Sequence, residues 1–174
     1  MSTILRNRLI GLAFAAVVLA LDLFIKGYVT GTLGLDEDGE QIVLTSFFNL
    51  TRTSNYGISL GLLTAQSMEM RWLLVAMTSA IALVVFVWLL REKKLADILP
   101  LGLVLGGALG NIRDRAAFGH VIDYADLHIG DWRPFLVFNL ADAAITVGVL
   151  IILARSFLIR EKHPDQAAVA ATEN

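Results

Sequence analysis

Four long apolar stretches constrain the fold of this chain more than any other feature of its sequence. They cover residues 9–25, 72–90, 95–112 and 134–154. The hydrocarbon core of a bilayer is about 30 Å thick and takes roughly 20 helical residues to cross. Each stretch comes close to that length. We therefore predict a mostly α fold: an integral membrane bundle of four transmembrane helices.

The composition agrees with a membrane location and excludes several kinds of function. Hydrophobic residues make up 56% of the chain and charged residues only 17%, whereas about a quarter of the residues of soluble domains are charged. The formal net charge of −2 offers no basic field that would attract nucleic acid. The chain has no cysteine, which excludes disulfides, thiol catalysis, thiolate metal sites and S-acylation.

The first apolar stretch could instead be a signal peptide behind Arg6 and Arg8. Asp22 interrupts it and no A-x-A cleavage site follows, so we expect an uncleaved span. Basic residues in short loops favour the cytoplasmic side. Six of the fourteen are scattered on the other side or lie in polar clusters. The remaining eight closely flank span ends that share one side: Arg6, Arg8, Arg91, Lys93, Lys94, Arg155, Arg160 and Lys162. We therefore expect both termini in the cytoplasm and the connections 27–71 and 113–133 on the outer side.

Both outer connections contain strand-like patterns. The segment "QIVLTSFFNLTRT" is rich in β-branched and aromatic residues, and "HVIDYADLHIGDWR" alternates, with Gly130 and Asp131 as a turn signal. These patterns predict a small extracytoplasmic β-rich cradle, mainly from residues 27–71. We expect residues 1–162 to form a single four-helix membrane domain. Residues 163–174 are polar and alanine-rich, which predicts a disordered cytoplasmic tail.

Two features within the spans are explained by packing and pairing. Gly102, Gly106 and Gly110 form one stripe on a helix, which favours close helix packing inside the bundle over a dimer interface. Asp22 and Lys26 lie four residues apart and share a helical face. A lone charge at the centre of a span costs roughly 2.5–3.5 kcal/mol, and pairing offsets part of that cost. A structural ion pair is the favoured interpretation, and a functional Lys26 stays open.

An acidic pair in the last third of the chain predicts chemistry. Pro134 is well placed as the first residue of helix four, which puts Asp142 about 12 Å along its axis. The neighbours of Asp142 are apolar, so its partner must come from another segment, and Asp123 is the best-placed candidate. Two adjoining carboxyls share one proton, so one acts as a base and the other as an acid. Water-mediated peptide hydrolysis needs such a pair.

Other roles for the polar residues in this region stay open. Intramembrane aspartates also serve as proton relays, ion sites or partners of arginine, and Asp114 and Arg115 offer local ion pairs. Asn111 and Asn139 could orient the carboxyls or could satisfy one another. The three histidines share no metal-ligand spacing, so we predict no metal site.

Two rival functions remain at this point. A Ser/Lys membrane peptidase would use Lys26 with Ser46, Ser54 or Ser59, although no sequence context marks any of these serines as a nucleophile. A small proton-coupled transporter or scaffold is the other rival, although four spans are few for a transporter that does not oligomerise.

Four motifs occur in a fixed order along residues 9–158: "DLFIK" (22–26), "NYG" (55–57), "GGALGNIRDR" (106–115) leading to "GHVIDY" (119–124), and "FNLAD" (138–142). Each is weak alone, but in this order on four spans they are highly specific. In these motifs the chain resembles the lipoprotein signal peptidase family, also called signal peptidase II, of bacterial membrane aspartic proteases.

The resemblance implies a four-helix bundle in the bacterial cytoplasmic (inner) membrane, with both termini cytoplasmic and the active site at the outer, periplasmic face. The implied activity is that of an aspartic endopeptidase that removes signal peptides from prolipoproteins, cutting just before a cysteine that carries diacylglycerol. It implies no cofactor and no metal. The partners would be those prolipoproteins and membrane lipid, and we expect a monomer.

The same motif matching assigns roles to individual residues. Asp123 and Asp142 would be the catalytic aspartates. Four further residues would line the site, contact substrate or support the aspartates: Asn55, Asn111, Arg115 and Asn139. Asp22 and Lys26 match a pair that is mainly structural in the family and lies near the site.

The chain departs from the family pattern in two places. After "NYG" the family usually has small residues and then phenylalanine, whereas this chain has Ile58, Ser59 and Leu60, which affects the shape expected for the cradle. The family often has a proline immediately before "FN". Here Pro134 lies four residues before Phe138, so the start of helix four could be shifted.

Overall fold

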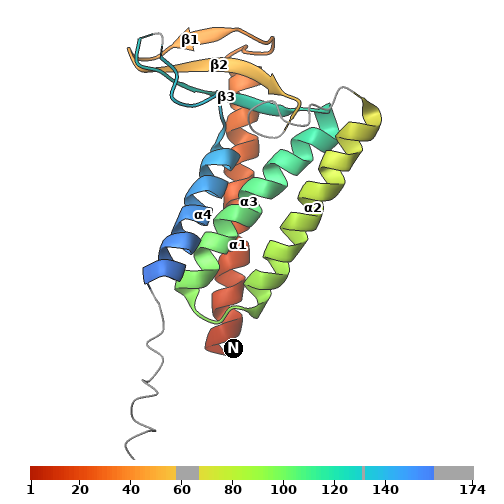
Figure 1. Ribbon diagram of the computed structural model, residues 1–174, viewed down its shortest axis with the longest axis vertical. Helices are drawn as coiled ribbons and strands as arrows, with labels where there is room; N and C mark the ends of the chain where they lie inside the picture. The colour runs from red at the N-terminus through yellow and green to blue at the C-terminus, as the bar shows by residue number, and fades with distance from the viewer. Residues whose placement is uncertain (58–66, 131, 159–174) are drawn as a thin grey trace, which may run out of the picture.

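The computed structural model describes residues 1–57, 67–130 and 132–158. Four helices form a bundle that is capped at one end by a small sheet (Figure 1). The helices are α1 (Thr3–Gly27), α2 (Met68–Arg91), α3 (Leu95–Phe118) and α4 (Leu140–Leu158), and a π-helical turn, η1 (Tyr28–Thr32), continues α1. All four helices are long and apolar enough to cross a membrane. The predicted four-span architecture is confirmed.

The sheet is antiparallel, with the order β1-β2-β3. Its strands are β1 (Gln41–Val43), β2 (Phe48–Asn55) and β3 (Val121–Leu127), so both outer connections contribute to it, as the strand-like patterns predicted. Strand β3 is buried along nearly its whole length. A second small core, which includes Val29 of η1 and Tyr124 of β3, joins the sheet to the top of α1. The prediction of a β-rich cradle is confirmed.

Helix α3 lies at the centre of the bundle and contacts the other three helices. Glycine allows this close approach: Gly102 and Gly106 lie against the backbone of α1, and Gly107 lies against Ala141 of α4. Gly148 of α4 in turn packs on the backbone of α3. The glycine stripe therefore packs within the bundle, as predicted.

We expect Gly107→Ala to destabilise the protein by about 1–3 kcal/mol, the range for overpacking a close contact. A methyl group at this position would collide with the carbonyl oxygen of Ala141, so α4 would have to move away from α3. Gly27→Ala is the matched control, because nothing lies within 4 Å of a β-carbon there. Thermal unfolding of both variants in detergent measures the difference, and equal stability would contradict the packing argument.

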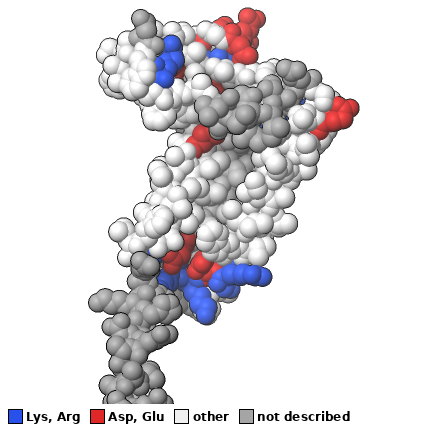
Figure 2. All heavy atoms as spheres, in the orientation of Figure 1, with Lys and Arg blue, Asp and Glu red and all other residues white. Residues whose placement is uncertain are grey.

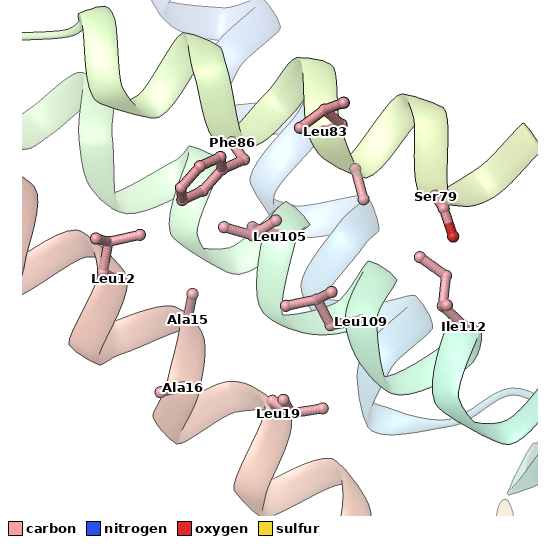
Figure 3. Close-up of a pocket in the computed structure, with 11 residues that line it drawn as sticks. Leu12, Ala15, Ala16, Leu19, Ser79, Leu83, Phe86, Leu105, Leu109 and Ile112 are labelled. Carbon is pink, nitrogen blue, oxygen red and sulfur yellow. The ribbon is translucent and has the colours of Figure 1, made fainter. Parts of the chain in front are cut away.

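The outer wall of the bundle carries few charges. Figure 2 shows charged side chains gathered near the two ends, with an uncharged band between them on the face shown. A groove of about 450 Å³ opens between α1 and α2, with α3 behind it (Figure 3). Ser79 supplies the one polar side chain among its lining residues. The groove has no titratable lining, so the chemistry must lie elsewhere.

The sequence-based boundaries need two corrections. Helix α3 continues to Phe118, so the second outer connection begins at Gly119 and not at Arg113. Helix α4 begins at Leu140 and not at Pro134. The predictions for residues 58–60 and for the tail 163–174 fall outside the described residues.

Candidate active site

The N-terminus of α4 is set by Asn139. The Asn139 side-chain oxygen accepts a hydrogen bond from the backbone nitrogen of Asp142 at 2.9 Å, and an Asp142 carboxylate oxygen lies 3.3 Å from the backbone nitrogen of Asn139. This reciprocal pattern is a capping box with an aspartate in the third position. Asp142 therefore lies in the first turn of α4, at the sheet end of the bundle, and not about 12 Å inside the helix as predicted from Pro134.

Asp123 reaches the same region from β3. Its side chain is buried, and its two oxygens accept hydrogen bonds from Asn55 at 3.0 Å and from Asn139 at 2.6 Å. Asn55 is the last residue of β2, next to β3 in the sheet. The antiparallel pairing therefore fixes one donor on Asp123, and the cap of α4 provides the other.

Asn139 and Asn111 connect the two aspartates. Asn139 is fully buried and contacts both Asp123 and Asp142, as described above. Asn111 of α3 donates to the other Asp142 oxygen at 2.8 Å, and its own side-chain oxygen accepts from Asn139 at 3.2 Å. The structure thus joins Asp123 and Asp142 through one continuous set of amide hydrogen bonds. Asn111 and Asn139 therefore bond to the carboxyls and also to one another, which are the two roles that the sequence left open.

Lys26 lies beneath this network and holds two buried carboxylates. Its ammonium group is 2.8 Å from Asp22 and 2.8 Å from Asp114, both of which have no exposed surface. It also donates to Asn111 at 3.2 Å. The predicted Asp22–Lys26 ion pair is confirmed, with Asp114 as a third member. Asp22 additionally accepts from the backbone nitrogen of Ala141, which ties α1 to the start of α4.

These contacts weigh against the Ser/Lys alternative. The Lys26 ammonium group lies 2.8 Å from both Asp22 and Asp114 and donates a hydrogen bond to Asn111, so its close polar partners are two carboxylates and an amide. Within the described ranges no hydrogen bond joins a serine to Lys26. Ser59 falls outside the described residues.

Arg115 does not take its sequence neighbour Asp114 as its partner; it contacts Gly57 instead. Asp114 pairs with Lys26 and, at 3.3 Å, with Arg113. Arg115 is buried and donates to the carbonyl oxygen of Gly57 at 2.8 Å. This hydrogen bond fixes Gly57, the last residue of the "NYG" motif, which begins at the end of β2.

The carboxyls of Asp123 and Asp142 lie in different electrostatic environments. Burial, together with the negative charge of nearby Asp142, raises the pKa of Asp123 from 3.8 to about 7, despite the opposing effect of the Asn55 and Asn139 hydrogen bonds. Near neutral pH Asp123 therefore exchanges between its protonated and its charged form, and the protonated form can donate a proton. The partly exposed Asp142 accepts hydrogen bonds on both oxygens. One carboxyl can act as an acid beside another that can act as a base.

Sequence reasoning missed two residues that position the site. Asp114 lies three residues after Asn111 and therefore on the same face of α3, a spacing that could have indicated its link to Lys26. Tyr124 accepts a hydrogen bond from the backbone nitrogen of Leu140 at 3.2 Å. Burial raises the pKa of the Tyr124 hydroxyl to about 12. No local sequence signal indicated this second contact to the start of α4.

Comparisons with known proteins identify the family to which the chain is similar. Residues 14–158 match the family described as signal peptidase (SPase) II. The chain is 54% identical over 152 residues to a lipoprotein signal peptidase of Sphingopyxis alaskensis, covering 87% of each chain. It is 37% identical over 162 residues to the one of Francisella tularensis subsp. novicida, covering 91% of this chain and 98% of the relative.

A comparison with solved structures also finds a membrane enzyme of similar fold. The fold is similar to a solved bacterial membrane enzyme with a TM-score of 0.72 and 26% identity, covering 89% of this chain and 94% of that one. The family match extends over most of the chain and includes every residue of the amide network that links the two aspartates. This chain therefore belongs to the signal peptidase II family.

Proposed function

We propose that this chain is an aspartic endopeptidase in which Asp123 and Asp142 remove signal peptides from diacylglyceryl-modified prolipoproteins, cutting before the lipidated cysteine. Family membership supports the reaction class. One structural observation carries the mechanism: two carboxyls from separate elements, β3 and α4, both accept hydrogen bonds from Asn139, Asp123 from its side-chain amide and Asp142 from its backbone N–H. This shared contact lies at the end of the bundle where the apolar spans meet the sheet.

The proposed reaction uses the two carboxyls in opposite protonation states. The Asp142 carboxylate takes a proton from water, and the water oxygen bonds to the scissile carbonyl carbon while Asp123 gives its proton to the carbonyl oxygen. When the C–N bond breaks, the leaving nitrogen takes the proton from Asp142, and Asp123 recovers a proton from the collapsing diol. Both carboxyls return to their starting states, and no covalent enzyme intermediate forms.

The amide network has a positioning role in this proposal. Asn111 and Asn139 hold the oxygens of Asp142, and Asn55 and Asn139 hold those of Asp123. Fixed carboxyl orientations avoid a reorganisation cost in the transition state. Arg115 would position the segment around Gly57, on the side where substrate binds, through its hydrogen bond to the Gly57 carbonyl oxygen.

The expected orientation places the sheet and the site on the outer side of the inner membrane and both termini in the cytoplasm. Basic residues lie at the opposite end of the bundle from the sheet, including Arg91, Lys93 and Lys94 between α2 and α3 (Figures 1 and 2). Basic residues in a short loop between two spans favour the cytoplasmic side. The scissile bond of a prolipoprotein follows an apolar signal helix, so a site at this depth matches where that bond would lie.

The direct test is incubation of the purified protein, in detergent, with two versions of one precursor. One version carries diacylglycerol on its cysteine and the other does not. We expect cleavage of the modified precursor only, with the cysteine as the new N-terminal residue in mass spectrometry. Equal cleavage of both versions would remove the proposed lipid specificity, and cleavage at another bond would remove the proposed reaction.

The rate should fall as the pH rises through about 7, the pKa of Asp123, because above it both carboxyls are charged and the acid is lost. Asn55 donates to Asp123 and lowers that pKa. Asn55→Ala should therefore move the falling limb of the kcat–pH profile to higher pH. Gln41→Ala, on the far strand of the sheet, is the control and should leave the limb in place. A limb that stays in place or moves to lower pH in Asn55→Ala would contradict the assignment.

A further inference from the structure

One end of the sheet carries large apolar side chains that the rest of the described chain leaves uncovered. They come from two loops, one between β1 and β2 and one between β3 and α4, and their relative exposures run from 52% to 67%. We name this cluster the sheet tip: Leu44, Phe47, Ile129, Trp132, Phe135 and Leu136. Contiguous exposed apolar surface of this kind marks a binding or membrane-contact surface.

Backbone hydrogen bonds hold the sheet tip together. The backbone nitrogen of His128 donates to the carbonyl oxygen of Phe47 at 3.0 Å, which joins the two loops. Ile129 and Trp132 pair with one another through two backbone hydrogen bonds of 2.8 and 3.2 Å. Backbone hydrogen bonds therefore hold in place the two loops that carry these apolar side chains.

An ion pair between the half-exposed Arg133 and the buried Asp126 connects the sheet tip to the strand that carries Asp123. Arg133, next to Trp132, lies 3.0 Å from Asp126, which is only 1% exposed and also accepts from Thr51 at 3.1 Å. Asp126 lies three residues after Asp123 on β3. Displacement of the tip would therefore pull on the strand that holds one aspartate of the site.

The position of the sheet tip indicates what covers it. Figure 1 shows that this end of the sheet extends past the bundle on the side of α4, and that the loop after β3 leads down to the top of α4. The lipid-facing wall of α4, which includes exposed Val147 and Leu150, continues below. Tryptophan with a neighbouring basic residue is the composition that favours a membrane interface.

We propose that the sheet tip inserts into the boundary between headgroups and acyl chains of the outer leaflet, so that lipid anchors the sheet over the site. The anchor would hold β3 at a fixed height relative to the first turn of α4. The partner is thus the lipid surface itself. The inference goes beyond the peptidase function, and its test needs no catalytic activity.

Trp132 provides the probe. The chain has three tryptophans, so Trp72→Phe/Trp88→Phe leaves Trp132 as the single fluorophore of the full chain. The protein is reconstituted into vesicles of phosphatidylethanolamine and phosphatidylglycerol that carry bromine either near the carbonyls or near the acyl ends. We expect strong quenching by the shallow bromine, weaker quenching by the deep bromine, and little quenching by aqueous acrylamide.

A matched variant reports water exposure at the other end of the sheet. Glu37→Trp in a background with all three native tryptophans changed to phenylalanine places the fluorophore on an exposed polar loop, where acrylamide should quench it and bromolipid should not. If Trp132 behaves like this control, the proposal is overturned. It is also overturned if bromolipid quenches Trp132 only after precursor is added, because the tip would then bind substrate.

Shortening the apolar surface gives an independent check. Phe135→Ser/Leu136→Ser should at least halve the shallow quenching of Trp132, since both side chains are removed from the surface that enters the lipid. Phe157→Ser, at the far end of α4, should leave that quenching unchanged. Unchanged quenching in the double variant, in protein whose helical circular dichroism is normal, would contradict the proposal, because Trp132 would then meet lipid without insertion of Phe135 and Leu136.

Discussion

Asp142→Asn should lower kcat for a lipid-modified precursor by about 10³-fold or more, with little change in folding. An amide cannot take the proton from the attacking water, and a positioned acid or base contributes about 10²–10⁴-fold. Asparagine keeps the shape of the side chain, and the backbone nitrogen of residue 142 can still donate to Asn139. Mass spectrometry of timed digests measures the rate, and thermal unfolding in detergent measures the fold.

The two aspartates should behave as one unit. Asp123→Asn alone, and Asp123→Asn/Asp142→Asn together, should each be about as inactive as Asp142→Asn, because losing either carboxyl disables the shared step. Asp97→Asn is the control, since Asp97 pairs with Arg155 at the opposite end of the bundle and should retain activity. Near-normal processing by Asp142→Asn would leave the proposed mechanism without its base.

The elements that could be predicted from the sequence are those with a strong local signal. A span of about 20 apolar residues specifies a membrane helix with little help from its surroundings, and the alternating segment 120–133 contained β3. The predicted start of α4 was wrong because two local signals competed. Pro134 suits a first helical position, but Asn139 followed by Asp142 three residues later forms the cap that the structure uses.

Contacts between distant segments carry no such local signal. The pairing of Asp123 with Asp142 was inferred from the burial cost of a lone carboxyl, and their placement beside the same asparagine, Asn139, follows that logic. That Asn139 would contact both, or that Tyr124 would meet the start of α4, depends on how β3 crosses the top of the bundle. Only the tertiary arrangement determines those distances.

Lys26→Met should destabilise the protein by roughly 3–5 kcal/mol, the range for removing one partner of a buried ion pair. Asp22 and Asp114 are both completely buried and would lose their shared cation. The contact of Asp114 with the half-exposed Arg113 would remain and lessen the cost somewhat. Thermal unfolding in detergent should show the loss, together with a matching loss of processing.

The informative variant is Asp22→Asn/Lys26→Met/Asp114→Asn, which removes all three charges together. Replacing a whole buried ionic group by neutral residues is often nearly neutral in stability, so we expect most of the lost stability to return. Processing should return to within about tenfold of the native rate, since one hydrogen bond from Lys26 to Asn111 is still missing and such a bond contributes about 0.5–1.5 kcal/mol. If the triple variant is stable but as inactive as Asp142→Asn, Lys26 takes part in the reaction itself, as a Ser/Lys peptidase would require.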